Sequence, residues 1–168
     1  STAIIYTRDA TRLRSRIQRR SIMAITQAMC TLFKKDVMLG DQHLDSDVIM
    51  IALYTSSADL SAATDGYITS GQVANGGGYT TGGVALADKA VTENSTSGCF
   101  DATDPEWTSA TFTARGALIY NKTLGDASSN SRGAIAVLDF GGDFTVAGGT
   151  FKIVFPAATA SNAIVRID

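Results

Sequence analysis

A stretch of alternating side chains near the middle of the chain constrains the fold most strongly. It covers residues 108–121 and reads TSATFTARGALIYN. Apolar or small residues occupy every second position from Phe112 to Tyr120, and the positions between them are mixed. Because a β-strand sends successive side chains to opposite faces, this pattern predicts a strand with one apolar face. Such a face cannot be buried by one strand alone, so the strand must pack against others.

Several other segments show the features of strands and are separated by turn residues. The predicted strands are residues 48–54, 84–91, 134–140, 144–146, 151–155 and 163–167. Glycine-containing turns are expected at 141–143 and 147–149, and a polar loop is expected at 121–132. Short strands separated by Gly, Asn and Asp turns at roughly 8–12-residue intervals are typical of a sandwich or barrel. We therefore predict an all-β fold, namely a β-sandwich.

One helix is expected before the strands. Apolar residues from Ile22 to Phe33 follow a helical spacing, and Gly40 is suited to end the helix. A chain of 168 residues is one domain by length. The predicted organisation is a basic N-terminal arm at residues 1–22 and a single β-sandwich domain at 23–168, with a helix at about 22–38 and strands from about 47.

The charge of the chain is unevenly distributed. Residues 1–20 hold six of the 14 basic residues and one of the 16 acidic residues, so the arm carries +5 and the remainder −7. A basic arm on an acidic body favours contact with an acidic surface, on a protein subunit or on phosphates. Sequence-specific nucleic-acid recognition is not expected, because aromatic residues are scarce in the arm and the body is acidic. Residues 1–22 are either an arm that reaches a neighbouring subunit or an extension upstream of the usual start at Met23.

The sequence offers little for catalysis, cofactors or metals. His43 is the only histidine and lies in a polar turn, and no GxSxG, dinucleotide or zinc motif is present. Cys30 and Cys99 lack metal spacing and are expected as free or buried thiols. The acidic cluster Asp101, Asp104 and Glu106 is either a solvated turn or a cation site. We expect a protein that is not an enzyme, with no cofactor, and no apolar run is long enough to span a membrane.

From Met23 onward the chain carries a series of structural motifs that resemble those of a known family. They are MAITQAMCTLFKKD, DSDVIMIALYTSSADL, GYTTGGVAL, WTSATFTARGALIYN, AIAVLDFGG, GTFKIVFPA and NAIVRID. In these the chain resembles small virion proteins of tailed bacteriophages, and most of all a capsid cement (decoration) protein of short-tailed phages. The resemblance implies a jelly-roll form of the sandwich, a homodimer or homotrimer, and no catalytic residues. The basic extension at 1–22 departs from the family pattern.

The function that this resemblance implies is adhesion. The protein is expected to be made in the cytoplasm of the host bacterium, to bind the major capsid protein on the exterior of the virion, and to join neighbouring capsid subunits. The candidate partner-binding residues are Arg12, Arg16, Arg19, Arg20, Trp107 and Arg115, because Arg and Trp are frequent interface anchors. For Trp107 and Arg115, ordinary packing within the sandwich is the alternative. Two other roles remain open: a tail or fibre component that binds a host receptor or glycan through exposed Tyr67, Tyr79 and Trp107, and a small hydrolase that uses His43.

Overall fold

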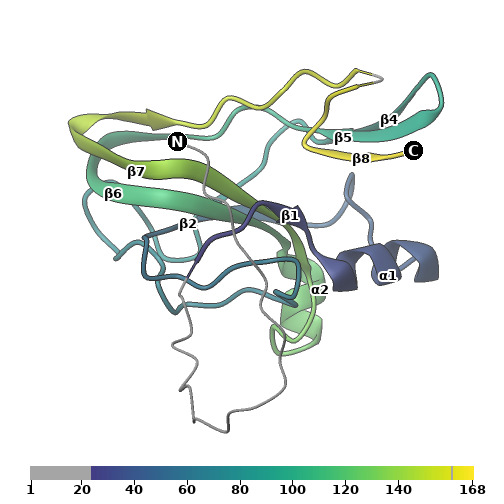
Figure 1. Cartoon of the computed structure of the whole chain (residues 1–168), viewed down its shortest axis with the longest axis horizontal. Helices are drawn as coiled ribbons and strands as arrows, with labels where there is room; N and C mark the ends of the chain where they lie inside the picture. The colour runs from purple at the N-terminus through teal and green to yellow at the C-terminus, as the bar shows by residue number, and fades with distance from the viewer. Residues whose placement is uncertain (1–23, 160) are drawn as a thin grey trace, which may run out of the picture.

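The structure, a computed structural model, describes residues 24–159 and 161–168, so the predicted arm lies outside the described residues. The described chain is mostly β, with two antiparallel sheets and two short helices (Figure 1). This confirms the predicted all-β class, and the two sheets are consistent with a sandwich. The strands are β1 Ala28–Met29, β2 Ile49–Tyr54, β3 Val84–Ala85, β4 Ala90–Asn94, β5 Ser97–Asp101, β6 Glu106–Asn121, β7 Ala134–Lys152 and β8 Val165–Ile167, and the helices are α1 Thr31–Leu39 and α2 Lys122–Ala127.

The strand predicted from the alternating stretch, β6, lies at the centre of the larger sheet. This sheet has the order β1-β7-β6-β2-β3, and the smaller sheet has the order β4-β5-β8. The strands are therefore divided five and three among the described residues, and the two four-stranded sheets of a jelly roll are not seen. The jelly-roll form is not confirmed.

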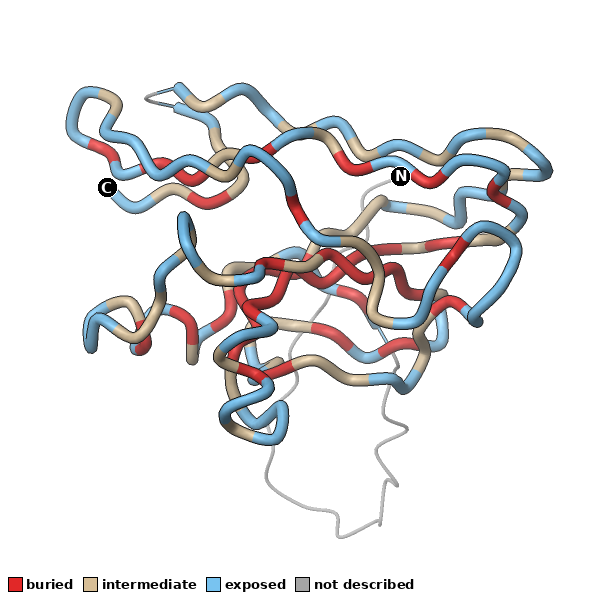
Figure 2. Tube along the Cα trace, turned by 180° about the vertical axis from the view of Figure 1, so that it is seen from behind, coloured by how far each residue is buried: buried red, intermediate tan, exposed pale blue. Residues whose placement is uncertain are grey.

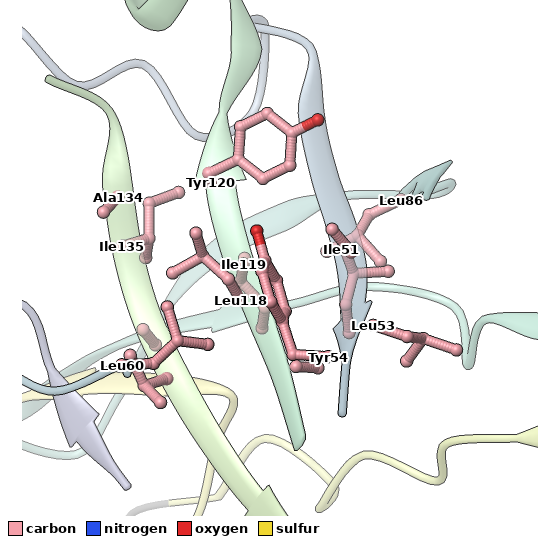
Figure 3. Packing of buried hydrophobic residues seen from close by; sticks show 14 of the residues in the cluster. Ile51, Leu53, Tyr54, Leu60, Leu86, Leu118, Ile119, Tyr120, Ala134 and Ile135 are labelled. Atoms are coloured by element: carbon pink, nitrogen blue, oxygen red, sulfur yellow. The ribbon is translucent and has the colours of Figure 1, made fainter. Parts of the chain in front are cut away.

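The core is formed where β2, β6 and β7 lie side by side. Ile51 pairs with Ile119, and Ile119 pairs with Ala136 on the far side of β6. The side chains of these three strands fill the space between the sheet and the loops that cover it (Figure 3). Buried residues are concentrated in this part of the chain (Figure 2). On β2, Ile51–Tyr54 are buried on both faces, and this strand lies between β6 and β3 in the sheet.

The long strand β7 corrects the prediction of separate strands joined by turns. Gly141 has φ +76° and Gly148 has φ +69°, but neither reverses the chain. β7 continues past both and stays paired with β6, with register shifts between the Gly116↔Asp139 and Ala114↔Phe144 pairs and near Gly149. Because glycine adopts positive φ readily, it suits a β-bulge as well as a turn. The predicted turns at 141–143 and 147–149 are therefore wrong.

Helix α1 is shorter than the helix predicted at 22–38. It begins at Thr31 and ends at Leu39, where Gly40 caps it with φ +76° as expected. The residues before it are extended, since Ile25 bridges Leu60 and the strand β1 pairs with β7. Backbone groups of this segment are satisfied by the edge of the sheet, and such tertiary pairing overrides a helical spacing of side chains.

Helix α2 occupies part of the segment predicted as a loop at 121–132. The side chain of Asn121 accepts a hydrogen bond from Leu124 N at 3.0 Å and so caps the first turn. The predicted strand at 84–91 is also divided, because β3 belongs to the large sheet and β4 to the small one. In the structure, α2 lies at one end of the β6–β7 pair, and the outer part of β7 lies at the other end (Figure 1).

Candidate interaction surfaces

The outer part of β7 carries an exposed apolar surface. Phe144 is 53 % exposed, and Val154, just after the strand, is 74 % exposed. They line a hollow of about 520 Å³ on this part of the chain. We call it the β7 surface and define it by its apolar lining residues Phe140, Phe144, Val146, Phe151, Ile153 and Val154.

A row of aromatic rings fixes the β7 surface to the interior. Phe144 meets Phe140 edge to face with ring centroids 6.2 Å apart, and Phe140 lies 6.1 Å from Phe151. Phe151 contacts Trp107 at 6.0 Å, and the Trp107 side chain is buried. Such ring pairs are specific in geometry and add to the stabilisation from burial. Phe144, at the exposed end of the row, is therefore anchored through Phe140 and Phe151 to the buried Trp107.

Among the residues that the structure describes, no strand pairs with the outer edge of β7 along this surface. β1 pairs only with Ala136 and Val137, and no other strand of residues 24–159 and 161–168 occupies that edge from Leu138 to Lys152. Thr145, Ala147 and Thr150 are exposed on this part of β7, and Thr145 Oγ1 lies 2.8 Å from Thr113 Oγ1 on β6. An edge strand presents unpaired N–H and C=O groups, which can pair with another chain.

Ion pairs within the chain flank this part of β7. Arg115 Nε donates to Asp143 Oδ1 at 2.7 Å, and Lys152 Nζ lies 3.3 Å from Asp104 Oδ2. The hydrogen bond to Asp143 raises the pKa of Arg115, which stays charged. Between these ion pairs, residues 144–151 carry no charge.

A second apolar hollow lies between α1 and the small sheet. Its volume is about 300 Å³, and Val91 on β4 and Ile167 on β8 line it while remaining 56 % and 46 % exposed. We call it the α1 hollow and define it by Phe33, Val37, Leu44, Val91, Phe100, Val165 and Ile167. The α1 hollow and the outer part of β7 lie toward opposite ends of the longest axis of the molecule (Figure 1).

The structure does not bring the predicted partner-binding residues together on one surface. Arg12, Arg16, Arg19 and Arg20 lie outside the described residues. Trp107 is only 3 % exposed and belongs to the core, which is the packing alternative considered for it. Arg115 is partly exposed on β6 and lines a small recess with Asp139 and Ile25.

The aromatic residues expected on a receptor-binding surface are turned inward. Tyr79 is 2 % exposed, and its hydroxyl accepts hydrogen bonds from Leu53 N at 3.0 Å and Gln72 Nε2 at 2.8 Å. Tyr67 stacks on Tyr120 with a centroid distance of 4.8 Å and is partly buried. The glycine-rich segment 71–83 that carries Tyr79 packs against β2 and β6, because a Cβ at Gly83 would lie 1.8 Å from Ile51 O.

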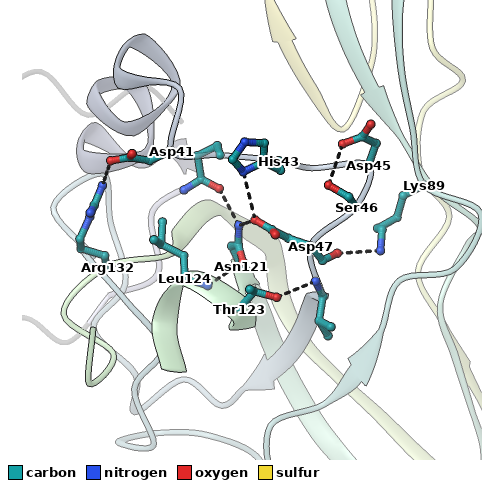
Figure 4. A network of polar contacts seen from close by, with 12 residues as sticks. Asp41, His43, Asp45, Ser46, Asp47, Lys89, Asn121, Thr123, Leu124 and Arg132 are labelled. Atoms are coloured by element: carbon teal, nitrogen blue, oxygen red, sulfur yellow. Dashed lines mark hydrogen bonds and ion pairs between the residues drawn. The ribbon is translucent and has the colours of Figure 1, made fainter. Parts of the chain in front are cut away.

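His43 takes part in a polar network that joins the 41–47 loop to α2 (Figure 4). Its Nδ1 lies 4.0 Å from Asp47 Oδ2, and the same oxygen accepts a hydrogen bond from buried Asn121 at 2.6 Å. Thr123 Oγ1 accepts from Val48 N at 3.0 Å, and Asp47 O accepts from Lys89 Nζ at 2.7 Å. These contacts hold the start of β2, the end of β6 and the loop together.

The acidic cluster at 101–106 has partners within the chain. Asp101 accepts from Ala102 N at 2.9 Å, and Asp104 accepts from Phe155 N at 2.9 Å. The bond from Phe155 lowers the pKa of Asp104, with a smaller effect from Lys152. Within residues 24–159 and 161–168 no group of three or more His, Cys, Asp or Glu side chains is placed to hold a metal ion.

The two cysteines are free and buried. Cys30 is fully buried before α1, and burial raises the pKa of its thiol to about 12. Cys99 lies on β5, and its Sγ is 3.5 Å from Thr159 O. A raised pKa disfavours the reactive thiolate.

Sequence reasoning missed both apolar surfaces. For the β7 surface one signal was present in the sequence. Residues 144–151 (FTVAGGTF) are long enough for a strand and contain neither a charged residue nor a proline. The α1 hollow is formed by segments far apart in the chain, and no local pattern marks it.

Comparison with protein-family models, with curated proteins and with solved structures finds no match to this chain. Among the described helices, neither is long and apolar enough to cross a membrane.

Proposed function

We propose that this protein is a non-enzymatic virion structural protein that binds the outside of a phage capsid and cements neighbouring capsid subunits. The observation that carries the proposal is the presence of two separate apolar surfaces on one packed body. A protein that joins two neighbours needs at least two contact surfaces. The β7 surface and the α1 hollow lie toward opposite ends of the molecule, as such a role requires.

The chemistry of the two surfaces supports adhesion. Exposed apolar patches rimmed by polar residues mark sites of protein–protein contact. Phe144 and Val154 expose apolar area on one, and Val91 and Ile167 on the other. Many weak contacts repeated over a lattice give high total affinity, so each contact can be small. A protein that binds only the assembled shell stabilises it by mass action.

The resemblance of the motifs from Met23 onward to those of capsid cement proteins names the partner, the major capsid protein. The tail or fibre role has no specific structural support, since Tyr79 and Trp107 are buried rather than displayed.

Shells assembled without this protein and then supplied with it provide the test. We expect the purified chain to co-sediment with shells and to raise the temperature and internal pressure at which they break. Val91→Asp and Val154→Asp should each weaken this effect, while Thr92→Asp, an exposed neighbour on β4, should leave it unchanged. Equal shell stability with and without the protein would reject the proposal, and binding limited to tails at six or twelve copies per particle would favour the tail role instead.

A further inference from the structure

The glycine-rich segment 71–83 contains the only asparagine of the chain that is followed by glycine, Asn75 before Gly76. Such a pair is especially prone to deamidation, because a residue without a Cβ lets its backbone nitrogen reach the side-chain amide carbon of the asparagine. Both residues are exposed, and a Cβ placed on Gly76 would meet no atom within 4 Å. The space beside the reacting atoms is therefore open to water.

We infer that Asn75 is a deamidation site at which the reaction proceeds only when the segment 71–83 opens locally. In the reaction the Gly76 nitrogen bonds to the side-chain amide carbon of Asn75 and gives up its proton, and the amide nitrogen of Asn75 leaves as ammonia. Water then opens the resulting cyclic imide at either of its two carbonyl groups. The product is an aspartate or an isoaspartate, and in the isoaspartate the main chain runs through the former side-chain carbon.

In the closed segment both reacting groups are engaged in other hydrogen bonds. The Gly76 N–H donates to Tyr79 O at 2.8 Å, and Asn75 Oδ1 accepts from Thr81 N at 3.2 Å. The attack requires the Gly76 nitrogen to lose its proton and the amide of Asn75 to turn toward that nitrogen. Both hydrogen bonds must therefore break before the imide can form.

Contacts with β2 and β6 hold the segment closed. Thr111 N on β6 donates to Gly77 O at 2.8 Å, and the hydroxyl of buried Tyr79 accepts from Leu53 N on β2 at 3.0 Å. These contacts can break while β2, β6 and β7 stay paired, which is the kind of local opening that proteins undergo below the free energy of global unfolding. Because such opening is fast relative to imide formation, the deamidation rate follows the population of the open segment.

The isoaspartate product cannot restore the closed segment. It adds one carbon to the main chain just before Gly76, so the pair of hydrogen bonds between Gly76 and Tyr79 no longer fits. The amide of Tyr79, which donates to Gly76 O at 3.0 Å, should therefore exchange with solvent faster in the modified chain. Modification of Asn75 thus makes a transient opening permanent.

Incubation of the full chain at mildly alkaline pH, followed by peptide mapping, tests the inference. The mass gain of an amide-to-acid change and an isoaspartate assay identify the product at Asn75. We expect the native chain to react more slowly than the urea-unfolded chain by about tenfold or more, because only the open segment reacts. Asn75→Gln should yield no product at this position, since its longer side chain closes a larger ring far more slowly. Equal rates in the native and unfolded chains, or no product at Asn75 in urea, would overturn the inference.

Two tyrosine variants determine whether the opening is local. Tyr79→Phe removes the acceptor of buried Leu53 N, so it should raise the native rate by about fivefold or more and leave the rate in urea unchanged. Tyr54→Phe is the matched control, because it loses a hydrogen bond to Ile68 O outside the segment and should not change the rate. Acceleration by both variants in proportion to their loss of unfolding free energy would make global unfolding the route and overturn the inference. The absence of any acceleration in Tyr79→Phe would overturn it as well.

Discussion

The guanidinium group of Arg132 lies 2.6 Å from the carboxylate of Asp36 and joins the segment before β7 to helix α1. The Asp36 side chain is only 1 % exposed, and its second oxygen has no hydrogen-bond partner within the described chain. Arg132 also donates to Asp41, and hydrogen bonds to the two carboxylates raise the pKa of Arg132, so its charge persists. The pair therefore links two segments distant in sequence at a buried point.

Arg132→Ala should destabilise the fold strongly, because it leaves the Asp36 carboxylate buried without its partner. The double variant Arg132→Ala/Asp36→Ala should regain part of the lost stability, since the uncompensated charge is gone. Denaturant unfolding of the wild type and both variants measures the difference. A double variant no more stable than the single one would show that the buried charge is not the cause.

Gly83→Ala should be far more damaging than Gly82→Ala. Both glycines have positive φ, +80° and +93°, so the backbone strain of an alanine is similar at the two positions. A Cβ at Gly83 would lie 1.8 Å from Ile51 O on β2, whereas at Gly82 the nearest atom is the Tyr120 hydroxyl at 3.5 Å. We expect a loss of about 1 kcal/mol for Gly82→Ala and a much larger loss for Gly83→Ala. Similar melting temperatures for the two variants would contradict the close approach of this segment to β2.

Leu118→Ala should cost about 2–5 kcal/mol of unfolding free energy, because Leu118 is fully buried on β6 and its removal leaves a cavity. Leu39→Ala is the matched control, since Leu39 is 62 % exposed at the end of α1. Its effect should stay within about 0.5 kcal/mol. Urea denaturation of both variants compares them, and equal losses would argue against the position of β6 at the centre of the core.

Stability should fall as the pH rises above about 10. Burial raises the pKa of Tyr54 and of Tyr120 above the ordinary value of 10.0. Because the folded chain then holds these protons more tightly than the unfolded chain, their contribution is complete below pH 10 and is lost as the pH rises toward the folded pKa values.

Tyr54→Phe separates this effect from general alkaline unfolding. At neutral pH it should cost roughly 1 kcal/mol, since the Tyr54 hydroxyl donates to Ile68 O at 2.5 Å. Above pH 10 its melting temperature should decline less steeply than that of the wild type. Parallel declines for the two proteins would show that Tyr54 does not titrate in this way.

Thiol reagents should modify Cys30 only as fast as the chain opens. The thiol is fully buried and its pKa is raised to about 12, so little thiolate exists at neutral pH. The Cys99→Ser variant retains Cys30 as its single thiol, and its labelling rate should rise sharply in denaturant. Rapid modification of that variant under native conditions would contradict the burial.

The strands could be predicted from the sequence because their signal is local. The alternation around Phe112–Tyr120 follows from the two-residue period of a strand, and the short apolar run at Ile49–Tyr54 is typical of a strand buried on both faces. The role of Gly141 and Gly148 could not be predicted from the sequence, because a glycine with positive φ is compatible with a turn or with a bulge. Only the pairing of β7 with β6 distinguishes the two. The prediction of a helix at 22–38 was wrong in its early part for a related reason. Ala28 pairs with Val137, which lies more than a hundred positions away in the sequence.

The candidate surfaces depend even more on distant contacts. Trp107 carries the residue type of an interface anchor, yet Tyr79 and Phe151 enclose it. Phe144 is an aromatic strand residue, yet it is 53 % exposed on a part of β7 with which β1 does not pair. Exposure of this kind is set by strand length and topology rather than by the residue itself.

The pairing of Ala28 with Val137 and of Ile49 with Asn121 has a consequence for biosynthesis. β1 and β2 leave the ribosome before β6 and β7, the strands that they join, have been translated. The large sheet can assemble only after β6 and β7 leave the exit tunnel. Assembly of the large sheet is therefore expected only once β7 has left the tunnel, and until then the apolar β2 segment is open to chaperones.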